Sequence, residues 1–161
     1  MRLINAPQRA TRRKRCSIMS YKYLEEIGTA DIAFEAVGHD LAELFRDAAD
    51  ATTNVMIDNI EAIQPRETRQ IELTNEKTDM LLFDLLQELI FLKDAERLLL
   101  RMREIEIHQG DGIFRVKATA EGESLDAERH HQRADVKAVT LHDFSVEQTE
   151  DGWKARVLLD I

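Results

Sequence analysis

Two aspartates stand far apart in the chain, each beside a segment with the pattern of a β-strand. Asp31 precedes the alternating residues 32–37, and Asp160 follows the apolar pair Leu158-Leu159. Side chains in a strand point alternately to its two faces, so a carboxylate at a strand end is held by the sheet and still reaches solvent. If the two strand ends meet, repulsion between the carboxylates is relieved most simply by a bound cation.

All donors at this expected site are oxygens. The terminal carboxylate of Ile161 adds a third donor to Asp31 and Asp160, and such a set suits Ca²⁺, Mg²⁺ or Mn²⁺ with waters filling the shell. The alternative is that both aspartates are surface residues that cap turns, because aspartate is mostly exposed in proteins. The residues alone leave both interpretations open.

Histidines mark a second candidate region. A polar loop expected over residues 122–135 carries His130 and His131, and His142 follows the next expected strand. Imidazole binds metals and changes charge near neutral pH, so contact with a metal or a partner is one interpretation. The other is that these histidines are exposed to solvent or satisfied within the core. The same two interpretations hold for three charged residues nearby: Arg129, Asp135 and Lys137.

The charge of the chain is unevenly distributed. Six basic residues and no acidic one fall within residues 1–19, which leaves 16 basic and 31 acidic side chains, a net charge of −15, in residues 20–161. A body this acidic repels the phosphates of nucleic acids, which basic proteins bind by releasing counterions. The composition therefore disfavours stable nucleic-acid binding and favours a cation or a basic protein surface as the ligand.

Residues 1–19 are expected to be a basic, disordered leader, with Met19-Ser20 as the natural start and residues 20–161 as one domain. The alternative is a nucleic-acid-binding or targeting tail, although the segment has no aromatic residue to stack on bases. Cys16 is the only cysteine, which excludes an intramolecular disulfide and makes a reducing cytoplasm the default location. No apolar run approaches the roughly 20 residues of a membrane span.

Two helices are predicted. Asp40 is a good N-cap for a helix that fades near residues 54–58, and Glu43 completes a capping-box-like arrangement. The second helix opens at Thr78 and is apolar on nearly all sides for roughly 17 residues, which is typical of a helix buried on more than one side. Charged interruptions such as Asp84 exclude it as a membrane span.

Strands are predicted for the remaining segments, with hairpin turns at 109–112 and 149–152. They cover residues 21–25, 31–37, 67–73, 98–108, 113–121, 136–148 and 153–160. Strands and helices are mixed at first and then give way to a run of antiparallel strands. This order predicts an α+β fold with two helices packed on antiparallel sheet.

The sequence lacks the motifs that mark common catalytic sites. It has no glycine-rich phosphate loop, no G-x-S-x-G elbow, no H-E-x-x-H helix and no Cys-His pair at a suitable spacing. This favours a protein that is not an enzyme. The enzyme alternative is a metal-dependent phosphoesterase built on the same carboxylates, which needs a nucleophile or an activated water near two metals.

Several segments together resemble the archease family, in the family's order and spacing. They begin with the sequence T-A-D-I and end with Leu-Asp-Ile. The matching segments are 29–32 with Gly38, 80–90, 125–130, 136–142 and 159–161. The resemblance extends from about Tyr21 to Ile161 and leaves only the basic leader uncovered.

The resemblance implies a cofactor protein of an RtcB-type RNA ligase rather than an enzyme. That ligase joins RNA ends with a 2′,3′-cyclic phosphate or 3′-phosphate to a 5′-hydroxyl in tRNA splicing and RNA repair, using GTP and Mn²⁺. Archease-like proteins promote guanylylation of the ligase's active-site histidine and allow repeated turnover. The family's metal site falls on Asp31, Asp160 and Ile161, and its fold is a sandwich related to the strand-helix-strand-strand module.

The sequence departs from the family pattern at three positions. Gly28 replaces the histidine that the family has before T-A-D, Arg129 replaces a lysine, and Leu141 replaces an aromatic residue. The change at Gly28 is expected to loosen the metal loop. We expect the acidic body to dock near a basic, RNA-binding ligase. The residues expected to contact it are Arg129, His130, Asp135, Lys137 and His142. The competing hypothesis is a chaperone or adaptor for another RNA-modifying enzyme, such as an RNA methyltransferase.

Overall fold

The computed structural model describes residues 20–24 and 31–161. Its elements are β1 (Tyr21–Tyr23), β2 (Asp31–Gly38), α1 (Leu41–Met56), the 3₁₀ helix η1 (Ile60–Ala62), β3 (Glu67–Asn75), α2 (Thr78–Glu96), β4 (Leu98–Gly110), β5 (Ile113–Ser124), β6 (Ala138–Thr149) and β7 (Gly152–Asp160). One sheet has the order β1-β2-β7-β6 and the other β3-β5-β4. All strand pairs are antiparallel.

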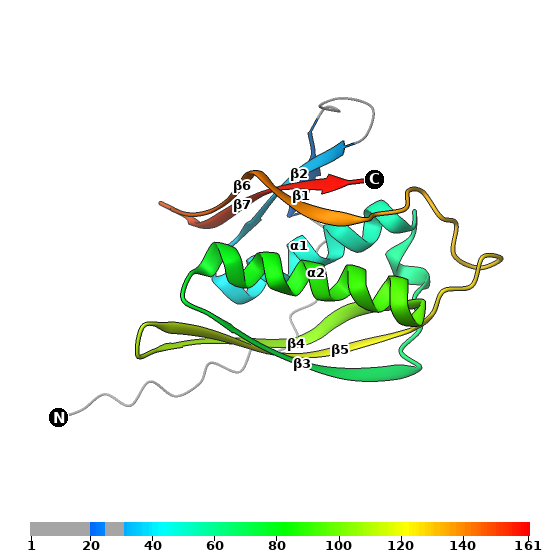
Figure 1. Ribbon diagram of the computed structural model, residues 1–161, viewed down its shortest axis with the longest axis horizontal. Helices are drawn as coiled ribbons and strands as arrows, with labels where there is room; N and C mark the ends of the chain where they lie inside the picture. The colour runs from blue at the N-terminus through cyan, green and yellow to red at the C-terminus, as the bar shows by residue number, and fades with distance from the viewer. Residues whose placement is uncertain (1–19, 25–30) are drawn as a thin grey trace.

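The two helices lie between the two sheets, which gives a three-layer arrangement (Figure 1). The predicted α+β fold of two helices with antiparallel strands is therefore confirmed. The expected loop over residues 122–135 needs a correction, because β5 continues to Ser124 and includes Gly122 and Glu123. The expectations for residues 1–19 and for Gly28 fall outside the described residues.

α1 begins directly after Asp40, as its capping pattern predicts. The Asp40 carboxylate accepts a hydrogen bond from the Glu43 backbone N–H at 2.8 Å. The helix buries several small side chains, among them Ala48 and Ala51. Small side chains let a helix approach its neighbours closely, which suits a position between two sheets.

α2 is the core helix that its sequence predicts. Leucines on more than one side of it are fully buried, for example Leu81, Leu82 and Leu85. It ends at Glu96, and the next residue, Arg97, caps it in a left-handed backbone conformation with a φ of 53°. Within the described ranges, no helix combines the length and the apolar character that crossing a membrane requires.

Gly122 provides a test of how closely the strands pack. It lies in β5, the middle strand of its sheet, and a Cβ there would overlap the backbone carbonyl group of Leu99. We expect Gly122→Ala to lower the free energy of unfolding by about 1–3 kcal/mol, because pairing on both sides keeps the backbone from moving aside.

The measurement is urea denaturation of the two proteins side by side. Gly110→Ala is the control, since a Cβ at that position meets nothing within 4 Å. It should change the free energy of unfolding by no more than about 1 kcal/mol. Equal effects of the two substitutions would contradict the overlap at Gly122.

Candidate metal centre and the residues around it

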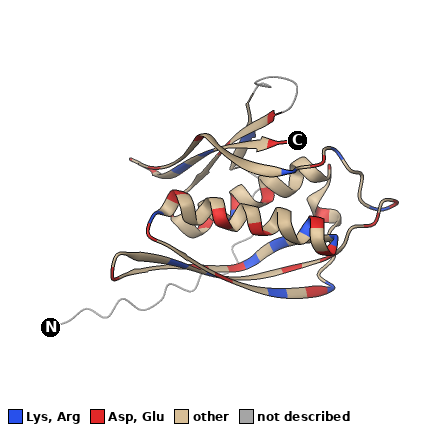
Figure 2. Cartoon of the chain, viewed as in Figure 1, with Lys and Arg blue, Asp and Glu red and all other residues tan. Residues whose placement is uncertain are grey.

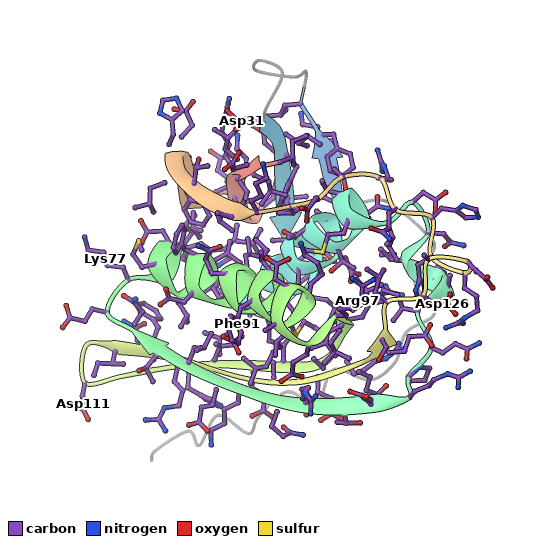
Figure 3. All side chains as sticks on the ribbon, turned by 45° about the vertical axis from the view of Figure 1, so that its right-hand side comes forward. Asp31, Lys77, Phe91, Arg97, Asp111 and Asp126 are labelled. Carbon is purple, nitrogen blue, oxygen red and sulfur yellow. The ribbon has the colours of Figure 1, made fainter. Side chains whose placement is uncertain are left out.

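Asp31 and Asp160 lie directly opposite each other where β2 pairs with β7. Opposite residues of an antiparallel pair point to the same face of a sheet, with Cβ atoms about 4.5–5.5 Å apart. The two strand ends therefore meet, as the sequence leads one to expect, and the two aspartates lie together at one end of the inner strands of the sheet. Figure 3 shows Asp31 at this end of the molecule.

The acidic residues on this face of β2 and β7 differ in whether a nearby lysine balances their charge. Phe34 of β2 is buried in the core, whereas Asp31 and Glu35 lie on the opposite face of the strand. Glu35 forms ion pairs at 3.4 and 3.7 Å with two lysines, Lys22 and Lys154. Among the described residues, neither Asp31 nor Asp160 has a cation or a hydrogen-bond donor at its carboxylate. The pair thus concentrates negative charge that no side chain of the described residues neutralises.

The third expected donor is the terminal carboxylate of Ile161. This residue directly follows β7, and its side chain is partly buried and packs against the core. No three His, Cys, Asp or Glu side chains are grouped to hold a metal ion within the described part of the chain. Two side chains thus supply two donors, and a third oxygen has to come from the main chain, the chain terminus or water. Such an all-oxygen set fits a hard divalent cation.

The main chain on both sides of Asp160 is fixed. The Lys137 backbone N–H donates a hydrogen bond to the Asp160 carbonyl at 2.8 Å. Ala138 of β6 and Asp31 of β2 lie opposite Asp160 on its two sides. Because the strand is paired along both edges, the position of the Asp160 carboxylate depends on little besides its own side-chain torsions.

His130 lies in the core with 1% of its surface exposed. Its Nε2 is 2.8 Å from Glu123 Oε1, and its Nδ1 accepts a hydrogen bond from the Asp126 backbone N–H at 2.9 Å. Since Nδ1 accepts, we assign the ring proton to Nε2, which donates it to Glu123. The expectation that His130 touches a partner is therefore corrected: it is a core histidine that holds its loop from inside.

Glu123 is the centre of this cluster. Its Oε2 lies 2.6 Å from the Arg129 guanidinium and 3.2 Å from that of Arg66, and its Oε1 accepts from the Gln64 N–H at 3.1 Å. Burial raises the pKa of the Glu123 carboxyl, but the hydrogen bonds from Arg129, a backbone N–H and His130 outweigh burial and lower that pKa. The carboxylate therefore stays charged and holds the partly exposed Arg129.

Asp135 is exposed but tied to α2. Lys93 Nζ lies 2.9 Å from Asp135 Oδ1 and donates to the Val136 carbonyl at 2.9 Å. The hydrogen bond and the charge of Lys93 lower the pKa of Asp135. This link fixes the segment that leads into β6, and the Asp135 side chain remains open to a partner.

His142 is exposed, in an irregular stretch of β6 between Thr140 and Ser145, with Nε2 3.5 Å from Asp143. It is four residues along the strand from Ala138, which lies opposite Asp160. At roughly 3.3 Å per residue this separation keeps the imidazole away from the carboxylate pair. His142 can contact a partner, but the structure does not bring it to the candidate metal centre.

Six of the eight predicted site residues thus lie in two places, whereas Asp135 is tied to Lys93 of α2 and His142 lies further along β6. Those at one end of the four-stranded sheet are Asp31, Asp160, Ile161 and Lys137. Arg129 and His130 instead gather around Glu123, at the end of β5 in the other sheet. The roles of Glu123 and Lys93 were missed, because Glu123 lies in a segment expected to be a loop and Lys93 meets Asp135 across 42 positions of the chain. No local pattern marks either residue.

Fold and site together define a class of protein. It is a two-sheet α+β domain with both helices inside and with facing carboxylates where β2 meets the last strand. Over residues 21–161 the chain matches the model of the archease protein family (MTH1598/TM1083). The chain belongs to the archease family, which its T-A-D-I and terminal segments predicted.

Individual relatives agree with this assignment. The chain is 37% identical over 134 residues to the protein archease of Pyrococcus abyssi. These aligned residues are 83% of this chain and 94% of that protein. The solution structure of protein 1598 of Methanobacterium thermoautotrophicum is similar with a TM-score of 0.77 at 36% identity, over 89% of this chain and 100% of that one. An archease from Thermotoga maritima, described as a possible chaperone, shares the fold with a TM-score of 0.56 at 21% identity, over 83% and 93% of the two chains.

Proposed function

We propose that the protein is a non-enzymatic activator of an RtcB-type RNA ligase in the cytoplasm, promoting guanylylation and repeated turnover of that ligase. The observation that carries the proposal is the facing pair of Asp31 and Asp160 in a chain of the archease family. The net charge of −15 in residues 20–161 supports a basic protein, rather than RNA itself, as the direct partner.

The residues that hold the divalent ion in this proposal are Asp31, Asp160 and the carboxylate of Ile161. When bound there, a cation supplies positive charge for the phosphates at the ligase's nucleotide site. β2 and β7 hold the two side-chain carboxylates against each other. The hydrogen bond from Lys137 secures the strand that carries Asp160. The role of this chain is to position charge, and the covalent chemistry belongs to the ligase.

The test is multiple-turnover RNA joining by the ligase encoded in the same genome, with and without this protein. One RNA carries a 2′,3′-cyclic phosphate and the other a 5′-hydroxyl, in the presence of GTP and Mn²⁺. We expect the ligase alone to stall after few turnovers, and the two proteins together to turn over repeatedly with faster guanylylation of the ligase. Equal rates with and without this protein would contradict the proposal.

Two further arms separate the competing hypotheses. Hydrolysis of phosphate esters by this protein alone would identify a metal-dependent phosphoesterase. Co-purification with an RNA methyltransferase, together with no effect on the ligase, would identify a chaperone or adaptor. A mobility-shift assay with the protein alone should show no stable RNA complex, because the acidic body repels the RNA phosphates.

A further inference from the structure

A groove runs along the outward side of α2, between the edge strands of the two sheets. Leu73 of β3 borders it on one side and Lys137, directly before β6, on the other. Its volume is about 770 Å³. Because β3 and β6 are both at sheet edges, no further element of the described ranges 20–24 and 31–161 covers α2 between them (Figure 1).

The floor of the groove contains an exposed aromatic side chain. Phe91 of α2 is 58% exposed, although most apolar residues of this helix are buried. The rest of the apolar lining comes from Ala95, one turn further along the helix, Ile90 and Leu73. Figure 3 shows Phe91 on this side of α2. An aromatic side chain that is open to solvent within a groove is the type of residue that anchors protein–protein contacts.

Acidic residues surround this apolar floor, and Figure 2 shows them recurring along α2. Asp84 accepts a hydrogen bond from the neutral Asn75 amide at 3.1 Å, and Asp94 shares Lys93 with Asp135. Glu88 has no ion-pair or hydrogen-bond partner in the described part of the chain. Like charges four positions apart on a helix repel, so a cation that approaches Asp84 and Glu88 relieves an existing repulsion.

The groove and the candidate metal centre meet at one residue, Lys137. Lys137 lines the groove, and its backbone N–H donates to the Asp160 carbonyl at 2.8 Å. Lys137, at the end of the groove, is therefore a direct neighbour of the strand that carries Asp160. One partner can occupy both places, with the phosphates at one end and a basic segment at the other.

We propose that the α2 groove binds a basic surface segment of the partner ligase, in which an apolar side chain packs on Phe91 and flanking lysines or arginines pair with Glu88 and Asp84. The identity of the partner rests on the proposed function, and the chemistry of the segment rests on the groove itself. An apolar contact ringed by charge pairs excludes water from the anchor and orients the two proteins.

The experiment measures the dissociation constant between the full-length protein and the purified ligase. Phe91→Ser and Glu88→Lys should each weaken binding about tenfold or more, through loss of the anchor and introduction of like charge. The matched controls are Ile113→Ser at the β4–β5 hairpin and Glu104→Lys on β4, both at exposed positions outside the groove. The controls should bind within about twofold of the unchanged protein.

The outcomes separate this inference from the proposed function. If the unchanged protein stimulates the ligase but both groove variants bind like the controls, the groove proposal is overturned and the proposed function stands. If the unchanged protein neither binds nor stimulates the ligase, both fail. Loss of binding in the groove variants, with thermal midpoints equal to those of the controls, supports the groove.

Two other occupants have their own signatures, and either would overturn the proposal. A dimer in sedimentation that Phe91→Ser dissociates would assign the groove to a second copy of this chain. The chain's own basic residues 1–19 are the other candidate. A fall in the thermal midpoint after their removal that is absent in the Phe91→Ser variant, with ligase binding unchanged by Phe91→Ser, would assign the groove to that segment.

Discussion

Asp31→Asn and Asp160→Asn should each reduce divalent-cation affinity and ligase stimulation by about 10- to 100-fold, as loss of groups that support a metal site does. The two side chains face each other across β2 and β7, so neither can compensate for the other. The same variants should fold at least as well as the unchanged protein. Like charges directly opposite in a sheet are destabilising, and removing one should raise the free energy of unfolding by about 0.2–1 kcal/mol.

A variant that stimulates the ligase less but is more stable distinguishes a metal site from aspartates that merely cap turns. Loss of a structural cap would lower stability and leave stimulation intact. The measurements are calorimetric titration with Ca²⁺ and Mn²⁺, guanylylation of the ligase, and urea denaturation. Stimulation and cation affinity equal to those of the unchanged protein would end the metal-centred version of the proposal.

Glu35→Gln is the matched control for these variants. Glu35 lies on the same face of β2 as Asp31, but its carboxylate is balanced by Lys22 and Lys154. Its replacement also removes one negative charge from the same sheet. We expect stimulation to be retained and stability to fall by no more than about 1 kcal/mol, since both partner lysines are exposed to solvent, where ion pairs contribute little.

The helices and most strands could be predicted from the sequence because their signals are local. Asp40 caps α1 through its near neighbour Glu43, and the apolar pattern after Thr78 specifies a buried helix whatever it packs against. The pairing of Asp31 with Asp160 was foreseen only as a possible meeting of strand ends. That expectation used only a general property of strands, which is that the sheet fixes the positions of their ends.

The remaining features depend on contacts between distant segments. Nothing near β3 or β5 indicates that these strands form a separate sheet below the helices. His130 follows a charged residue in a polar stretch, so its burial becomes visible only when Glu123 is placed beside it. Phe91 shows the converse: it lies in an apolar helix and yet faces solvent, because β3 and β6 leave that side of α2 uncovered.

Glu123→Ala should be the most destabilising of the substitutions considered, lowering the free energy of unfolding by about 2–4 kcal/mol. The buried carboxylate is 2% exposed and joins the end of β5 to the loop that carries Arg129 and His130. Its removal leaves the His130 Nε2–H and the Gln64 N–H without their acceptor. Urea denaturation measures the loss.

Glu121→Ala is the matched control for that variant. Glu121 lies in the same strand and pairs with Arg103 at 2.9 Å, but both side chains are partly exposed. We expect its replacement to change the free energy of unfolding by no more than about 1 kcal/mol. Similar losses in the two variants would show that the Glu123 cluster contributes no more than a surface ion pair.

The contribution of Glu123 should also depend on pH in a defined direction. The pKa of its carboxyl is lowered in the folded protein, against about 4.3 in an unfolded chain. The folded state therefore binds fewer protons near pH 4, and stability rises with pH there. The stabilisation from this charge is present in full above the unfolded pKa and is lost as the pH falls through the folded pKa.

The difference in stability between the unchanged protein and Glu123→Gln should accordingly be constant from pH 7 to about pH 5 and shrink in more acidic buffer. A difference that persists unchanged to the acid end would mean that the shape of this side chain, rather than its charge, holds the loop.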